Sequence, residues 1–196
     1  MGNVGSIVNM LKHIGHVATV SADPAEIAKA DKLILPGVGA FDAGMEAIER
    51  IGLRETLKEK VLRRQAPVLG ICLGMQLITR GSEEGKLPGL GWIAADTVKF
   101  RPQDGREELR IPHIGWNSVM PRVSGPLFAG LEQGTRAYFV HSYHVRCDDE
   151  DDVLAWTPYG PQFPSIIGHG NVLGMQFHPE KSHKHGMRLF KNFLAL

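Results

Sequence analysis

The sequence predicts an α/β protein whose mostly parallel central sheet is flanked by helices. In the first half of the chain, short apolar segments alternate with amphipathic helical segments, a pattern typical of parallel strands joined by helical crossovers. In the second half, apolar segments follow one another with short connections, which predicts an antiparallel extension of the sheet. The length of 196 residues suits one domain, over residues 1–196.

The first half supplies the helices and the parallel strands. Apolar residues at helical spacing predict a helix over 4–14, and proline at the first helical position favours a second over 24–30. Helical sequence returns over 43–64, with a break near Gly52 because glycine weakens the interior of a helix. Short apolar segments predict strands over residues 17–20, 32–35 and 67–71.

The second half is predicted to consist mainly of strands, over residues 92–100, 113–119, 137–145, 153–156, 165–167 and 172–177. The acidic run 148–152 is expected to form a solvated loop. The chain ends in an amphipathic helix, which is expected to pack on the sheet through apolar residues at helical spacing. These residues are Met187, Phe190, Phe193 and Leu194.

Composition excludes several classes of function. The formal charge of +1 provides no electrostatic footprint for nucleic acid. No apolar run approaches the roughly 20 residues of a membrane helix, and the first residues lack the pattern of a signal peptide, so the expected location is cytoplasmic. Two cysteines in such a chain are expected to be separate thiols. Cys147 lies among acids that disfavour a thiolate, and no role is assigned to it.

Residues 67–76 carry the strongest local signal for chemistry. A buried strand there ends in Gly-x-Cys-x-Gly, centred on Cys72, and continues as a helix. A nucleophile on such a tight turn adopts a strained backbone conformation, and flanking glycines remove side chains that would collide. The start of a helix also favours a thiolate. A structural core cysteine would not need this glycine frame, so Cys72 is predicted to be a nucleophile.

A nucleophilic thiol needs a base and a group that orients the base. His178 follows a predicted strand, and Glu180 lies two residues later across a proline, which suits a carboxylate that fixes the histidine tautomer. An alternative treats His178, Glu180, His183 and His185 as metal ligands. Their spacing matches no common zinc motif and the neighbouring lysines oppose a cation, so catalysis is favoured.

The third requirement is a pair of N–H groups that stabilise the oxyanion of the intermediate. The residue after the nucleophile, Leu73, supplies one in a turn of this kind. The loop at Val38 and Gly39 ends an earlier parallel strand, and the carboxyl ends of parallel strands lie on one edge of a sheet. The loop is therefore the candidate for the second donor, although a plain glycine-rich turn explains it equally well.

Taken together, these segments resemble the class I, or triad, glutamine amidotransferases, and more closely the glutaminase subunits of imidazole glycerol phosphate synthases. The resemblance covers nearly the whole chain. It rests on the nucleophile turn, on His-Pro-Glu and on the narrower Pro-Gly-Val-Gly and Gly-Trp-Asn segments. The matching segments are residues 2–3, 35–41, 70–76, 82–85, 113–117, 138–143 and 177–182.

The resemblance implies a glutaminase mechanism without a cofactor or metal. Cys72 attacks the glutamine carboxamide, His178 assists the proton transfers and Glu180 orients His178. The residues implied to hold glutamine are Gln76, Glu84, Ser142 and Tyr143. The implied partner is a (β/α)8 barrel synthase subunit that forms a heterodimer with this chain, receives ammonia and builds an imidazole ring in histidine biosynthesis. The residues implied to contact it are Asn3, Trp116 and Lys181.

Two features depart from the family pattern. The family begins with an apolar strand before the Gly-Asn turn, and this sequence starts at the turn, so one inner strand is expected to be missing. Residues 181–187 and 90–93 are at least as similar to paralogues that serve aminosugar synthesis for surface polysaccharide as they are to the imidazole glycerol phosphate synthase subunits. This leaves a second candidate acceptor for ammonia.

Two other classes of function remain as alternatives. A cysteine peptidase or a DJ-1-like protein would also use a cysteine on a strand-to-helix turn, but those families lack the combined His-Pro-Glu and Gly-Met-Gln pattern. A degenerate, non-catalytic scaffold is the other alternative. Retention of all three triad side chains argues against it.

Overall fold

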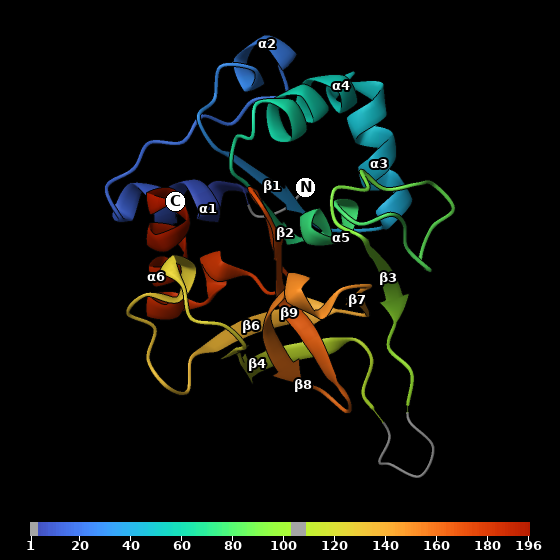
Figure 1. Ribbon diagram of the computed structural model, residues 1–196, viewed down its shortest axis with the longest axis vertical. Coiled ribbons are helices and arrows are strands. Elements are labelled where there is room, and N and C mark those ends of the chain that lie inside the picture. Colours follow the sequence, from blue (N-terminus) through green and yellow to red (C-terminus); the bar gives the residue numbers. More distant parts are fainter. Residues whose placement is uncertain (1–3, 103–108) are drawn as a thin grey trace.

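A six-stranded mixed sheet runs through the centre of the computed structural model, which describes residues 4–102 and 109–196 (Figure 1). The first three strands in spatial order are parallel, and the remaining three continue the sheet in antiparallel pairs. The predicted α/β class is therefore confirmed. The strands, in spatial order, are β1 (Leu33–Gly37), β2 (Val68–Cys72), β10 (Val172–Met175), β9 (Gln162–His169), β8 (Val153–Pro158) and β5 (Met120–Pro121).

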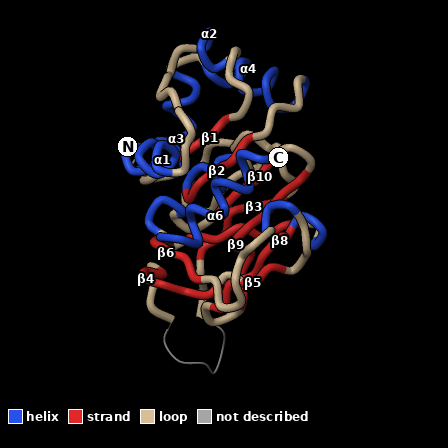
Figure 2. Tube along the Cα trace, turned by 90° about the vertical axis from the view of Figure 1, so that its left-hand side faces the viewer, coloured by secondary structure: helices blue, strands red, loops and turns tan. Residues whose placement is uncertain are grey.

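Two separate two-stranded antiparallel sheets lie beside the antiparallel strands of this sheet. β3 (Ala95–Lys99) pairs with β7 (Tyr143–Cys147), and β4 (His113–Ser118) pairs with β6 (Arg136–His141). In the side view, α2 and α4 lie at the end of the molecule that carries β1, whereas β4 and β5 lie at the opposite end (Figure 2).

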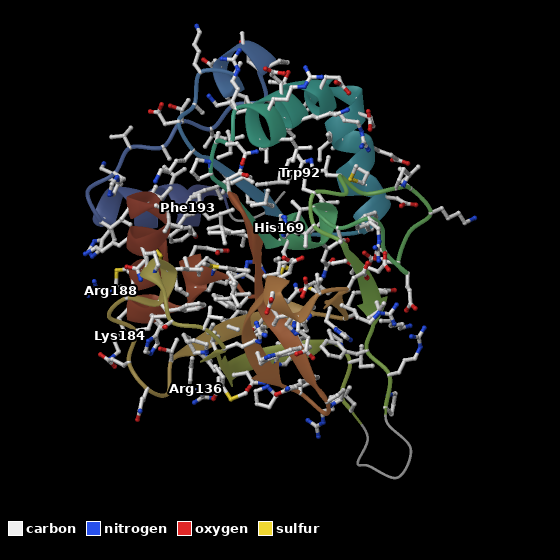
Figure 3. All side chains as sticks on the ribbon, in the orientation of Figure 1. Trp92, Arg136, His169, Lys184, Arg188 and Phe193 are labelled. Atoms are coloured by element: carbon white, nitrogen blue, oxygen red, sulfur yellow. The ribbon has the colours of Figure 1, made fainter. Side chains whose placement is uncertain are left out.

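Helices cover both faces of the parallel strands, as the buried pattern of these strands requires. Leu69 and Ile71 of β2 pack in a core with α1 and α6, whereas Val68 packs in a second core with α3 and α4. On α6, Phe193 is buried while Lys184 and Arg188 point to solvent (Figure 3). The helices are α1 (Val4–His13), α2 (Pro24–Ile27), α3 (Phe41–Arg50), α4 (Leu53–Lys58, continued by a π-helix at Glu59–Arg63), α5 (Leu73–Leu77) and α6 (His183–Ala195).

Two strand predictions were wrong. Residues 17–20 form no strand, and Val17 is 99% exposed, because no strand lies beside them among the described residues. β1 is the edge strand of the six-stranded sheet, and its outer side is not paired with these residues. Residues 137–145 form two strands, β6 and β7, which bend at Ser142 and pair with different neighbours.

The parallel strands place three loops together. Gly37 is paired in register with Cys72, and Met175 with Ile71, so the segments that follow β1, β2 and β10 start at one edge of the sheet.

None of the helices in the described part of the chain has the length and hydropathy to cross a membrane. Residue 3 and the segment 103–108 lie outside the described residues.

Candidate active site

Cys72 ends β2 and begins α5 with a backbone conformation that side chains rarely adopt. Its φ is 54° and its ψ is −109°, which places it in a strained region. A Cβ at Gly70 would lie 2.6 Å from the carbonyl oxygen of Gly74, and one at Gly74 would lie 1.8 Å from that of Leu35. Only glycine fits at both positions, so the local sequence is what permits the strained turn.

The thiol of Cys72 is largely enclosed. The residue is 7% exposed, and its Sγ lies 4.0 Å from the carbonyl oxygen of Val140 and 4.0 Å from Nε2 of Gln176. The sulfur therefore faces one hydrogen-bond acceptor and one donor.

His178 and Glu180 form a buried pair beside this thiol. Nδ1 of His178 and Oε1 of Glu180 are 2.8 Å apart, and the two side chains are 4% and 1% exposed. The carboxylate fixes a proton on Nδ1, which leaves Nε2 without a partner among the described residues. Burial lowers the pKa of His178, but the neighbouring Cys72 and Glu180 outweigh it and raise the pKa to about 9. This environment favours an imidazolium at His178.

The segment around His178 is held by β6 and by the start of α6. The N–H of His178 donates to the carbonyl of Tyr138 at 2.9 Å. The hydroxyl of Ser182, itself fully buried, donates to the carbonyl of His178 at 2.7 Å and accepts from the N–H of Tyr138 at 3.0 Å. A Cβ at Gly186 would lie 1.8 Å from the carbonyl oxygen of Pro179, so α6 packs directly on this turn.

The loop predicted to supply an oxyanion donor lies beside the turn at Cys72. A Cβ at Gly37 would lie 2.9 Å from Cβ of Leu73, which shows how closely the end of β1 approaches the start of α5. Val38 is 41% exposed, and Gly39 has φ of 99°, a conformation that favours glycine. The loop thus combines exposure with an adaptable backbone.

The structure brings together two of the four residues predicted to hold glutamine. Nε2 of Gln76, on α5, lies 3.3 Å from the carbonyl oxygen of Tyr143, at the start of β7. Ser142 lies at the bend just before β7. Glu84 makes a different contact, because its Oε2 accepts from the N–H of Phe41 at 2.9 Å, at the first residue of α3. Glu84 therefore joins its loop to the helix that follows the glycine loop.

The residues predicted to contact a partner form an exposed aromatic and basic patch. The ring of Trp116, on β4, stacks on His183 at a centroid distance of 5.3 Å and lies edge-on to Tyr138 at 6.2 Å. Nζ of Lys181 lies 5.5 Å from the centre of the Tyr138 ring. We refer to Trp116, Tyr138, Lys181 and His183 as the aromatic patch. The third predicted contact, Asn3, lies outside the described residues.

A set of buried polar side chains behind the site was not predicted from the sequence. Gln176, His113 and His141 are at most 6% exposed. His113 Nδ1 and His141 Nε2 are 3.0 Å apart, and His141 Nδ1 lies 2.7 Å from the carbonyl oxygen of Tyr143. Their polar side chains at strand positions that are expected to be buried were the signal that could have predicted this set. Burying a polar group is costly unless it has a hydrogen-bond partner.

Other candidate groups lie apart from this site. Burial, together with Asp152, Asp148 and Asp149, raises the pKa of the Cys147 thiol to about 12, which opposes a reactive thiolate there. Within residues 4–102 and 109–196, no group of three or more His, Cys, Asp or Glu side chains is arranged to hold a metal ion.

Comparison with known proteins gives one family match and many similar sequences. The family model for class I glutamine amidotransferases matches residues 1–196. The chain is 49% identical over 196 residues to the imidazole glycerol phosphate synthase subunit HisH 2 of Pseudomonas aeruginosa, covering 100% of this chain and 96% of the relative. It is 50% identical over 194 residues to the subunit of the same name from Methanococcus maripaludis, covering 99% and 95% of the two chains.

Solved structures show the same fold at lower identity. A crystal structure of a glutamine amidotransferase superposes with a TM-score of 0.75 at 21% identity, covering 99% of this chain and 93% of the other. A chain of PurLQS from Thermotoga maritima gives a TM-score of 0.66 at 18% identity, with the same coverage of 99% and 93%.

Proposed function

The chain belongs to the class I glutamine amidotransferase family, and from this we propose that it is the glutaminase subunit of an imidazole glycerol phosphate synthase. In this role it hydrolyses glutamine to glutamate and ammonia for histidine biosynthesis. The name of the Pseudomonas relative, which is 49% identical over the whole chain, supports the proposal. The observation that carries the chemistry is the strained Cys72 turn beside a buried histidine and carboxylate that are 2.8 Å apart.

The proposed reaction proceeds through a thioester. The Cys72 thiolate attacks the carboxamide carbon of glutamine, and the carbonyl electrons move to oxygen. His178 donates its Nε2 proton to the departing nitrogen, so the C–N bond breaks and ammonia leaves. His178 then takes a proton from water, the hydroxide attacks the thioester, and glutamate departs as the sulfur regains its electron pair. Glu180 holds the ring of His178 in the required orientation throughout.

The neighbouring segments are proposed to bind the substrate and the oxyanion. The N–H of Leu73 and the Val38 and Gly39 loop would donate to the oxyanion, since the end of β1 approaches the start of α5 closely. The residues proposed to contact glutamine are Gln76, Glu84, Ser142 and Tyr143. In this structure the side chains of Gln76 and Glu84 are engaged with Tyr143 and Phe41, so glutamine would replace or extend those contacts.

A cyclase subunit with a (β/α)8 barrel is the proposed partner, in a heterodimer that passes ammonia to imidazole ring formation. The aromatic patch, with Asn3, is the proposed contact surface. We place the assembly in the cytoplasm, where glutamine is available to it. Both relatives described above carry the numeral 2 in their names, so a paralogous role that supplies ammonia to aminosugar synthesis is retained as the second candidate.

The first test compares Cys72→Ala with the parent chain, each mixed with the cyclase subunit of the same cell. We expect the variant to lose glutamate release completely and to retain cyclase binding, because only the nucleophile is removed. A glutamine-derived electrophile should label Cys72 and spare Cys147 in peptide mapping. Equal turnover by variant and parent would exclude this mechanism, and ammonia transfer only to a sugar amidotransferase would select the second candidate.

A further inference from the structure

A buried glutamine that the proposed mechanism does not use lies behind the nucleophile. Gln176 is 0% exposed. Its backbone N–H donates to the backbone carbonyl of Ser165 at 2.9 Å, which fixes the position of the residue next to the sheet. Its Nε2 lies 4.0 Å from Sγ of Cys72, and its Oε1 lies 3.2 Å from Nε2 of Gln76. A buried amide is costly unless its polar atoms have partners, and here the partners are the nucleophile and a second glutamine.

One backbone carbonyl fixes the direction of both side-chain amides. The carbonyl oxygen of Tyr143 only accepts hydrogen bonds, so the NH₂ group of Gln76, 3.3 Å away, must face it. The second hydrogen of that NH₂ group is directed at Oε1 of Gln176. The NH₂ group of Gln176 is therefore left facing the sulfur of Cys72. Reversing Gln176 would place two donors against each other and an oxygen against the sulfur.

The sulfur thus lies between groups that favour opposite protonation states. A thiol can donate toward the carbonyl of Val140, 4.0 Å away, but a thiolate has no hydrogen to donate and is disfavoured by that oxygen. The side-chain amide N–H of Gln176 interacts favourably with the thiolate, because a hydrogen bond to the charged form of a group stabilises that form. The donor is in place before the reaction and needs no reorganisation.

We propose that Gln176 is a positioning residue of the glutaminase, held by Gln76 so that its amide N–H stabilises the Cys72 thiolate. The inference rests on the proposed function, in which Cys72 is the nucleophile. The contact with Gln76 also connects the thiolate to the segment proposed to bind glutamine, since Gln76 and His141 both bond to the carbonyl of Tyr143.

A test of this role must separate the effect of Gln176 from that of the charged and titratable groups near the sulfur. His178 faces Cys72 from the segment after β10, with Glu180 behind it. The charge of His178 in turn contributes to lowering the pKa of His141, on β6. Gln176 is the uncharged donor in this set, so replacing it changes the stability of the thiolate while leaving all of these groups in place.

The test measures the rate of Cys72 alkylation by iodoacetamide against pH, on the full chain with and without the cyclase. Gln176→Glu keeps the side-chain shape and an acceptor for Gln76 but replaces the donor with oxygen. Gln176→Met removes the donor without adding charge. In both variants we expect the midpoint of the profile to rise by about one pH unit, which lowers the rate below the midpoint about tenfold. The limiting rate at high pH should match that of the parent chain.

Matched controls separate this role from packing. Gln133→Glu makes the same change on an exposed loop and should leave the profile unchanged. An unshifted midpoint in both Gln176 variants overturns the proposal, and so does a lower limiting rate without a shift, because that result reports altered access to the thiol. Peptide mapping assigns the label to Cys72. If Cys72→Ala keeps glutaminase activity, the proposed function fails; if it is inactive but the Gln176 profiles are unshifted, only this inference fails.

Discussion

At the scale of single residues, the site is defined by how burial and charge compete at His178. Burial disfavours the imidazolium, whereas Glu180 at 2.8 Å and the neighbouring Cys72 favour it, and the outcome is a pKa raised to about 9. A raised folded-state pKa means that protonated His178 stabilises the fold below its unfolded value near 6.5, and that this stabilisation is lost as pH rises toward 9. The carboxylate is thus expected to affect both the proposed reaction and stability.

Replacing Glu180 by Gln should therefore have two effects. Glutaminase activity should fall by on the order of a thousandfold or more, because the amide no longer fixes the tautomer and charge of the histidine. The pKa of His178 should also fall. The unfolding free energy of the variant should therefore decrease less between pH 6.5 and 9 than that of the parent chain. Steady-state kinetics and urea unfolding at pH 6.5 and 9 check this, with the exposed Glu132→Gln as control. Parent-like kinetics in Glu180→Gln would contradict the assigned role.

At the scale of elements, β4 and β6 are joined by a pair of neutral histidines. Burial lowers the pKa of His113 to about 4, and burial, with the charges of nearby histidines, lowers the pKa of His141 to about 3 despite a hydrogen bond to Tyr143. His141 donates from Nδ1 to that carbonyl, which leaves Nε2 to accept from Nδ1 of His113. Each ring therefore sits in one tautomer, and each must be neutral in the folded state.

This pair predicts acid sensitivity with a defined sign. Below pH 6.5 the unfolded chain binds protons that the folded rings exclude, so stability falls as pH falls toward the folded pKa values. One such histidine should cost about 2 kcal/mol of unfolding free energy between pH 6.5 and 5. His113→Gln should flatten this dependence by about that amount in urea titrations, while His16→Gln, at an exposed position, should not. An unchanged slope in His113→Gln would show that the ring is protonated in the fold.

At the scale of the whole molecule, an exposed surface is connected to the enclosed candidate site. The aromatic patch includes Tyr138, whose carbonyl accepts from the N–H of His178, so the patch and the candidate base share a strand contact. Val38 and its neighbours Gly39 and Ala40 are also exposed. The proposed oxyanion loop is thus accessible to a partner subunit, whereas the buried His178 is connected to the aromatic patch through Tyr138.

The isolated chain is expected to hydrolyse glutamine poorly until the cyclase binds. A glycine-rich loop can turn a backbone N–H toward the oxyanion at small steric cost, and one missing donor reduces the rate about a hundredfold to a thousandfold. Glutamate release should rise by that factor on adding cyclase. Lys181→Ala should weaken this activation and Lys29→Ala, an exposed lysine after α2, should not. Full activity of the isolated chain, unchanged by cyclase, would contradict this expectation.

The sequence by itself determined the features that depend on near neighbours. Gly70 permits the strained turn at Cys72 through a contact with Gly74, four residues later, and the spacing of His178 and Glu180 allows their hydrogen bond. Periodicity was sufficient for the α/β class and most elements. Such signals arise from local sterics and from which face a residue buries, so they can be read from the chain order alone.

Tertiary structure decided what depends on partners far away in the chain. Residues 17–20 look like a strand but pair with no described strand, and residues 137–145 divide because β6 and β7 pair with different strands. Gln176 and Cys72 are separated by 104 positions, and the direction of the Gln176 amide depends on Gln76 and on the carbonyl of Tyr143. A strand forms only where a neighbouring strand pairs with its backbone N–H and C=O groups. The orientation of a side-chain amide is defined only by the donors and acceptors around it.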